Sequence, residues 1–380
     1  MIKPSVLIVT AGVITVVLSA CPPLPPPSAP PPTLAAQVCD ANGNLNDVPF
    51  LMEPFKQGPP YDGDPQPDPN APINPEIQSD LVVAFKMAPQ SFRDQLCKLN
   101  RIFISRAGCS SSDPNTCTLT DDQIAYNSWG FREPDGDKYI AISLGLWKPD
   151  PEDPCPSPRR VCAPRFQKYH TRLVRALLDQ TADKDLNPPL IAKPRDPTPP
   201  SFNVSPDLPA LSVLASLAHE YGHVLWWETF VQPPGATSVS NTVNFCGGDF
   251  YPSGSWQGIR VDIPPGRWIG FGDIRPQPSG SDVSNLPHSL RWGDFAGAAR
   301  SLSRIYASGR WASALAAFSP DEDFVETFEL SVIIKAGLQT SSVSLGHGLP
   351  GIGILPVNPA SPLGKKLQCF GPLPRPSRQL

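Results

Sequence analysis

Apolar and polar residues follow different periods in the proline-poor windows of the chain, and these periods predict its regular elements. Residues 138–147 carry Ile140 and Ile142 at alternating positions, which predicts a β-strand with its larger aliphatic side chains on one face. A further extended segment is expected at residues 101–105, after a helix around residues 90–99.

A long apolar window at residues 208–229 predicts a helix that is apolar nearly all round and therefore buried. Prolines occur only at its start, where they suit a first helical turn. Its apolar residues are Leu214, Leu217, Ala218, Tyr221 and Leu225 on one face, and Leu211, Ala215, Gly222 and Trp226 elsewhere. Three polar residues, His219, Glu220 and His223, are set into this apolar surface.

Three other helices are expected. Leucines at helical spacing predict one over residues 168–182. Residues 294–317 predict another, with a break near Gly309. The last is expected over residues 320–336, ending at Gly337, because glycine is favoured just after a helix.

Proline dominates the rest of the chain, with 51 prolines in 380 residues. Because proline fixes φ and removes a backbone donor, long elements fit only in proline-poor windows. Residues 22–33 predict a polyproline II spacer, while residues 34–78, residues 232–290 and the C-terminal tail are expected to be irregular. Order is expected to begin near Asp80. The expected division is a signal peptide (1–20), a tether (21–79), one folded domain (80–345) and a proline-rich tail (346–380).

The N-terminus is typical of an export signal. Lys3 supplies a positive charge, and the apolar residues 6–20 are too few to cross a bilayer. They end at residues 18–21, Leu-Ser-Ala-Cys, which resemble the box at which bacterial lipoprotein signals are cut. The resemblance implies lipidation of Cys21 and anchoring in the cell envelope, facing the periplasm or the exterior. Pro22 stands where aspartate often retains lipoproteins at the inner membrane, which favours the outer membrane. The alternative is an ordinary secretory signal.

The chain has nine cysteines. Without Cys21 an even number remains, which predicts up to four disulfides in an oxidising compartment. The short spacings favour Cys109–Cys117 and Cys155–Cys162, leaving Cys39 with Cys97 and Cys246 with Cys369. Eight cysteines allow about 105 pairings, so spacing alone does not decide among them.

The charge of the chain excludes one class of partner. The net charge is -4 and only 17% of residues are charged, with no basic run. Domains that bind nucleic acid usually carry a clustered basic patch. We therefore expect no nucleic-acid partner.

The sequence His219-Glu220-x-x-His223 carries the candidate chemistry. Residues four apart share a helix face, so both imidazoles can bind one zinc ion, with Glu220 as general base toward a metal-activated water. Zinc lowers the pKa of such a water to about 7, and catalytic sites keep three protein ligands and an open position. The alternative is that neighbouring residues merely satisfy these polar side chains in a buried helix.

A third ligand must come from another part of the chain. The metzincin pattern needs glycine and histidine where this chain has Trp226 and Thr229. Glu322 and Glu326 lie four apart on a later helix, so Glu322 can bind zinc while Glu326 orients one of the histidines by a hydrogen bond. Glu322 is also placed to close a capping box with Ser319. The other candidates for the third ligand are Glu326 itself, Asp323, Asp294 and His288.

Two motifs together, His-Glu-(aromatic)-Gly-His at 219–223 and Glu-x-Phe-x-Glu-x-Phe at 322–328, resemble the gluzincin metallopeptidases, most of all the anthrax lethal-factor-like catalytic domains. The resemblance implies an α+β, zincin-like fold with a small mixed sheet, an active-site helix and a C-terminal helical part. It implies Glu322 as the third zinc ligand and Glu326 as its support. It also matches residues 139–146 to the edge strand along which peptide substrate lies.

Two features depart from that family. A tyrosine that stabilises the oxyanion usually stands seven residues before the ligand glutamate, where this chain has Leu315. Tyr306, Tyr251 and His288 are the alternatives for that role. The two motifs are also further apart than in compact members, so residues 232–290 are expected to be an insertion.

We therefore expect a zinc-dependent endopeptidase that holds one Zn²⁺ ion and acts on a protein or peptide substrate, with Glu220 as general base and then as the acid that protonates the leaving amine. One alternative is a zinc amidase acting on cell-wall peptide. Another is a non-catalytic, metal-binding scaffold lipoprotein of the cell envelope. Leu315 favours the scaffold, and Glu220 argues against it because a structural site needs no base.

Overall fold

The computed structural model describes residues 38–46, 50–53, 68, 71–118, 128–132, 137–149, 162–166, 200–226, 228–229, 238–240, 246, 250, 260–262, 295–317 and 320–372. The chain divides into two compact units, Met1–Ala35 and Ala36–Leu380, and all described residues belong to the second. The expected signal peptide, Cys21, the polyproline spacer and the helix at 168–182 lie outside the described residues. None of the described helices has the length and apolar composition that crossing a membrane requires.

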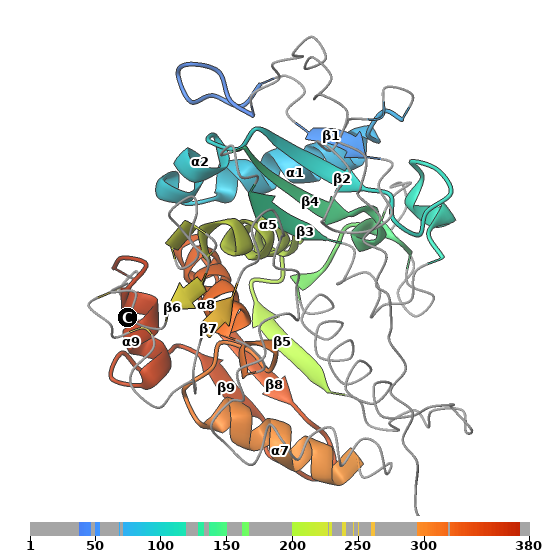
Figure 1. Cartoon of the computed structure of the whole chain (residues 1–380). Coiled ribbons are helices and arrows are strands. Elements are labelled where there is room, and N and C mark those ends of the chain that lie inside the picture. Colours follow the sequence, from blue (N-terminus) through green and yellow to red (C-terminus); the bar gives the residue numbers. More distant parts are fainter. Residues whose placement is uncertain are drawn as a thin grey trace, which may run out of the picture. The chain divides into compact units, whose positions relative to one another are not determined.

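The fold is mixed α+β, and a four-stranded mixed sheet forms one of its layers (Figure 1). The strand order is β1 (Phe50–Glu53), β2 (Arg101–Ser105), β4 (Lys138–Ser143) and β3 (Trp129–Arg132). β2 pairs in parallel with both β1 and β4, whereas β3 is antiparallel to β4. Both predicted strands are confirmed, but residues 144–147 form the 3₁₀ helix η2 and do not extend β4. The Ser143 hydroxyl accepts a hydrogen bond from the Gly145 N–H and turns the chain there.

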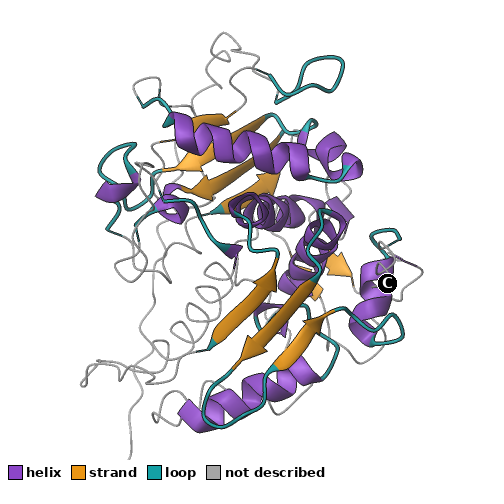
Figure 2. Ribbon diagram, turned by 180° about the vertical axis from the view of Figure 1, so that it is seen from behind, coloured by secondary structure: helices purple, strands orange, loops and turns teal. Residues whose placement is uncertain are grey.

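The two faces of β4 are both buried. Ile140 and Ile142 belong to the main core, while Tyr139 and Ala141 belong to a smaller aromatic cluster on the other face. The predicted separation of aliphatic side chains onto one face of this strand is therefore confirmed. On the main-core side, helix α1 (Pro75–Met87) crosses the strands (Figure 2).

The expectation that order begins near Asp80 is wrong, because β1 lies well before that residue and α1 begins five residues before it. The helix begins at Pro75, and the side chain of Asn74 accepts a hydrogen bond of 2.8 Å from the Glu76 N–H. Proline suits a first helical position, since the N–H it lacks has no partner there in any helix. Pro75 lies in a proline-rich segment that was expected to be irregular, but it is the first residue of a helix. Helix α2 (Gln90–Leu96) follows.

Helices α5 (Pro209–Trp226) and α8 (Pro320–Lys335) pack against each other in the core. They confirm the helices predicted at 208–229 and 320–336 to within a few residues, and α5 is buried on nearly all sides. Gly337 adopts a φ of +111°, which ends α8 as expected.

A second, antiparallel sheet is formed by β5 (Ser201–Ser205), β8 (Thr340–Ser344) and β9 (Ile352–Leu355). Helix α7 (Phe295–Ala307) lies beside it (Figure 1), and the 3₁₀ helix η5 (Leu315–Ala317) follows α7. The break predicted near Gly309 is confirmed, because α7 ends before this residue, whose φ is +60°.

The coil expected in the C-terminal tail is wrong. β9 and the helix α9 (Pro362–Gln368) lie there, and Leu363 and Leu367 of α9 belong to the main core. Prolines stand at the ends of these elements, as Pro362 does at the start of α9, so they delimit regular structure without preventing it. Residues 232–290 also include a short two-stranded sheet, β6 (Ser238–Ser240) with β7 (Arg260–Asp262).

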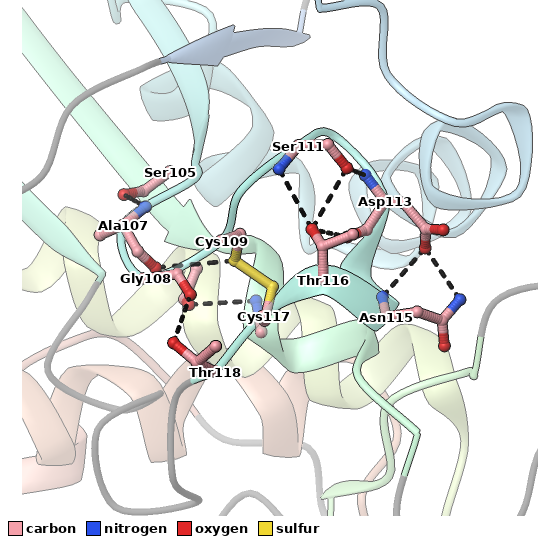
Figure 3. Close-up of a disulfide and its surroundings, with 12 residues drawn as sticks. Ser105, Ala107, Gly108, Cys109, Ser111, Asp113, Asn115, Thr116, Cys117 and Thr118 are labelled. Atoms are coloured by element: carbon pink, nitrogen blue, oxygen red, sulfur yellow. Dashed lines mark hydrogen bonds between the residues drawn. A yellow bond between two sulfur atoms is a disulfide. The ribbon is translucent and has the colours of Figure 1, made fainter.

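The described disulfides are Cys39–Cys97, Cys109–Cys117 and Cys246–Cys369. The structure joins Cys109 to Cys117 as their spacing predicts, and Figure 3 shows this bond at the base of a short polar loop. Cys162 is also disulfide-bonded, while Cys155, its predicted partner, lies outside the described residues. The Cys246–Cys369 bond ties the region after α5 to the residue that follows α9.

Candidate metal centre

The close approach of α5 and α8 brings the two sequence motifs together. Gly222 of α5 faces Val325 of α8, and a Cβ atom at position 222 would lie 3.1 Å from the Val325 Cγ1 atom. A larger residue would crowd Val325, which would have to shift by a few tenths of an ångström. The glycine of the first motif therefore sets the distance between His219 and His223 on one helix and the carboxylates on the other.

Helix α8 presents three glutamates to this contact. Glu322, Glu326 and Glu329 are only 1%, 2% and 1% exposed, and their spacing of four and three residues places them on one face of the helix. Buried carboxylates are unfavourable unless they are paired or coordinate a metal. The face is therefore chemically distinct from the apolar remainder of the core.

His219, His223 and Glu322 converge, as the sequence predicts. The Nε2 atom of His219 lies 3.8 Å from Glu322 Oε2, and the Nε2 atom of His223 lies 3.7 Å from Glu322 Oε1. One ligand atom from each residue lies within 4.8 Å of the other two. Two bonds of about 2 Å at a tetrahedral angle place their donor atoms about 3.4 Å apart. The three residues present are therefore close enough together to hold a single metal ion.

The cluster is not equally closed on all sides. The side chain of His223 is 20% exposed, compared with 8% for His219 and 1% for Glu322. Catalytic metal sites keep a position open for water or substrate. In this cluster the side of His223 is the one that solvent reaches.

The other ring nitrogen of His219 faces two carboxylates. Its Nδ1 atom lies 2.9 Å from Glu326 Oε1 and 3.4 Å from Glu329 Oε2. Glu326 was expected to orient a histidine, and the structure places it against His219. Glu329 was missed, although its position one turn further along the same face was a readable signal. His219, Glu326 and Glu329 form a second group of potential ligands that shares His219 with the first.

Burial dominates the electrostatics of the cluster. It raises the pKa of Glu220 to about 7, and it raises the pKa of Glu322 well above its usual value. Burial lowers the pKa of His223 well below its usual value. For His219, burial acts to lower the pKa, but the facing carboxylates, Glu326 foremost, outweigh it and raise the pKa well above the usual value.

Four carboxyl groups and two imidazoles therefore share one buried region. Burial, together with the charge of Glu326, also raises the pKa of Glu329 to about 8. Without a cation, such a cluster must hold extra protons to limit its negative charge. A divalent cation favours the deprotonated forms and so competes with those protons.

Other candidate residues are placed elsewhere or fall outside the description. Asp323 turns away from the histidines to Lys366, so it is not a ligand in this arrangement. Asp294, His288 and Tyr251 lie outside the described residues. Leu315 is buried in η5 and has no polar group to offer. The Tyr306 hydroxyl accepts a hydrogen bond of 3.3 Å from the Ala314 N–H.

The strand matched to a substrate-binding edge is not at an edge, so this expectation is wrong. β4, which contains most of residues 139–146, lies between β2 and β3. β3 instead ends the order of described strands, and it packs against α5. A Cβ atom at Gly130 of β3 would lie 1.8 Å from the carbonyl oxygen of Glu220.

Comparison of the chain with protein-family models, with curated proteins and with solved structures finds no match.

Proposed function

We infer that this protein is a zinc-dependent peptidase of the gluzincin type, with a zincin-like domain. The observation that carries the proposal is the convergence of His219, His223 and Glu322, each of which has one potential ligand atom within 4.8 Å of the other two. Two imidazoles and one carboxylate with an open side are the ligand set of catalytic zinc sites in peptidases. A hard cation such as magnesium prefers oxygen ligands, so the two nitrogens favour zinc.

Zinc held by these residues would polarise a substrate carbonyl and make a bound water more acidic. Glu220 lies next to His219 on α5 and is 4% exposed. Its burial raises its pKa to about 7, which suits a group that must accept and return a proton near neutral pH. Glu220 therefore takes a proton from the attacking water and gives it to the leaving amine.

The outer side of β3 supports a peptide substrate over a small molecule. β3 ends the order of described strands and lies against α5 beside Glu220. An extended peptide can add to such a strand by main-chain hydrogen bonds. This arrangement favours cleavage within a chain, and thus an endopeptidase, over removal of terminal residues.

A non-catalytic metal-binding scaffold is the second candidate. The observation in its favour is that Leu315 is buried and apolar where the gluzincins keep an oxyanion-stabilising tyrosine. A zinc amidase acting on cell-wall peptide would use the same residues with a different substrate. Lipid anchoring through Cys21 in the bacterial envelope remains a proposal from the N-terminal sequence.

The test uses the full chain produced in an oxidising compartment, as wild type and as Glu220→Gln. Bound metal is measured by elemental analysis, and cleavage with a peptide library that includes cell-wall peptides. Glu76→Gln is the matched control, because Glu76 lies in the first turn of α1 and belongs to neither group of potential ligands. We expect zinc in all three proteins and cleavage by wild type and the control only.

Each other outcome has a defined meaning. Zinc in all three proteins without cleavage by wild type would favour the scaffold. Cleavage restricted to cell-wall peptides would favour the amidase. Absence of zinc from the wild-type protein would rule out the proposed zinc site.

A further inference from the structure

A buried charged pair lies close to the candidate metal centre but does not belong to it. Lys366 of α9 donates hydrogen bonds of 2.7 and 2.6 Å to the two carboxylate oxygens of Asp323 on α8. The side chains are 3% and 0% exposed. The Lys366 ammonium also donates to the carbonyl oxygen of Arg310 at 3.4 Å and lies 4.7 Å from the centroid of the Trp311 ring. The ammonium group is thus enclosed by charged, polar and aromatic partners.

This pair holds the turn of α8 that carries the candidate ligand. Asp323 directly follows Glu322, and successive helical residues point about 100° apart, so Glu322 faces α5 while Asp323 faces α9. The Asp323 side chain is part of the first turns of α8, so its hydrogen bonds to Lys366 tie this end of the helix to α9.

Helix α9, which carries Lys366, is itself held in place by several contacts. Cys369, at the end of α9, is bonded to Cys246, and the Leu363 N–H donates a hydrogen bond of 2.9 Å to the carbonyl oxygen of Gly309. Gly364 approaches the preceding loop so closely that a Cβ atom would lie 2.2 Å from the Asn358 carbonyl oxygen. A lysine on such a fixed helix can define the position of the group it binds.

Stability alone is a weak reason for this arrangement. Removing both charges from water is costly, and well-packed apolar residues of similar volume are often as stabilising as a buried ion pair. An ion pair differs from apolar packing because its hydrogen bonds fix direction as well as distance. Asp323 is the residue next to Glu322, so hydrogen bonds that fix the direction of Asp323 can also help to fix the direction of the Glu322 side chain.

We propose that Lys366, acting through Asp323, is a positioning residue that holds the Glu322 carboxylate toward His219 and His223. The proposal rests on the proposed metal site. It makes α9 a part of that site's architecture, although α9 contributes no ligand.

The test compares the full-length wild type with Lys366→Met and Asp323→Asn. Two quantities are measured: hydrogen exchange of the amides in residues 321–326 of the metal-free protein, and the dissociation constant for zinc by competition with a chelator. Lys365→Met is the matched control, because Lys365 is the exposed neighbour on the same helix. Val343→Ala is the stability control, because Val343 is buried in β8, an element separate from the metal cluster.

Both Lys366→Met and Asp323→Asn should speed exchange in this turn by about tenfold or more and weaken zinc binding by about 10- to 100-fold, the usual effect of losing a supporting contact. The double variant should lose no more than either single one, because both changes break the same contact. Lys365→Met should change neither quantity, and Val343→Ala should lower the melting temperature without changing zinc affinity.

If hydrogen exchange in residues 321–326 is unchanged in both folded variants, the proposal is wrong, whatever their zinc affinity. Faster exchange with unchanged zinc affinity would also overturn it, since the pair would then hold the helix without positioning the ligand. If wild type binds no zinc, the proposed function fails, and exchange alone decides whether Lys366 holds this turn. Should Lys366→Met fail to fold, Asp323→Asn, which keeps the shape of the side chain, carries the test.

Discussion

The Nδ1 atom of His219 lies 2.9 Å from the Oε1 atom of Glu326. A carboxylate beside one ring nitrogen of a metal-binding imidazole fixes the orientation of the ring and directs the other nitrogen toward the metal. The other nitrogen of His219 is the one that lies 3.8 Å from Glu322. This contact is one of those that join the two sequence motifs, and it orients the His219 ring so that its other nitrogen faces Glu322.

The two carboxylates behind His219 should contribute unequally. Glu326→Gln is expected to weaken zinc binding by about 10- to 100-fold, because it removes the charged acceptor at 2.9 Å. Glu329→Gln should have a smaller effect, since its oxygen is 3.4 Å from the same nitrogen. Chelator competition measures both. A larger loss from Glu329→Gln would assign the orienting role to Glu329.

Replacing the third candidate ligand should be more damaging. Glu322→Gln keeps the size of the side chain but removes its charge, and it is expected to weaken zinc binding by more than about 100-fold, beyond the effect of supporting residues. Undiminished zinc affinity in this variant would move the third ligand elsewhere. Asp294 and His288 would then be the next candidates to replace.

Without metal, the stability of the protein should fall as pH rises from about 6.5 to 8. The pKa values of Glu220, about 7, and Glu329, about 8, are raised by burial, so the folded state binds more protons than the unfolded chain. Their contribution is present at low pH and is lost as pH rises through these values. The raised pKa of His219 acts in the same direction. The lowered pKa of His223 opposes it only up to its usual value of 6.5.

Thermal unfolding of the chelator-treated protein at several pH values measures this slope. Glu329→Gln should flatten it, because one of the titrating groups is gone. Added zinc should also flatten or reverse it, because its ligands must be deprotonated. A melting temperature that rises between pH 6.5 and 8 in the metal-free wild type would contradict this assignment.

Gly222→Ala tests the contact between the two helices. The new methyl group would lie 3.1 Å from Val325 Cγ1, which should force α5 and α8 apart and destabilise the protein by about 1–3 kcal/mol. Zinc affinity should fall with it, because the ligands come from both helices. Gly353→Ala is the control, since a methyl group there would meet nothing within 4 Å. Equal effects of the two substitutions on zinc binding would argue against this role for Gly222.

The sequence predicted the helices α5 and α8 and the residues that meet between them. Both helices have clear starts and long apolar runs, and spacing alone places His219 with His223 and Glu322 with Glu326. Glu329 was not predicted, because Glu322 as ligand and Glu326 as its support already complete the expected pattern. How many side chains surround an imidazole depends on the packing of two helices, which spacing within one helix does not reveal.

Proline-rich sequence led to wrong predictions of coil near both ends of the folded part of the chain. Pro75 and Pro362 stand at the first position of α1 and α9, where proline is compatible with a helix, yet their neighbourhoods were expected to be coil. The edge strand was wrongly assigned for another reason. β4 has the stronger alternating pattern, but order within a sheet is set by pairing with β2 and β3, which lie elsewhere in the sequence.

The central claim is that His219, His223 and Glu322 hold one zinc ion. The most direct test is the metal content of the purified, full-length protein, compared with a variant in which all three residues are replaced by alanine. We predict one zinc ion per chain in wild type and none in the triple variant. Wild type without a bound metal, or a triple variant that still holds one zinc ion per chain, would contradict the account.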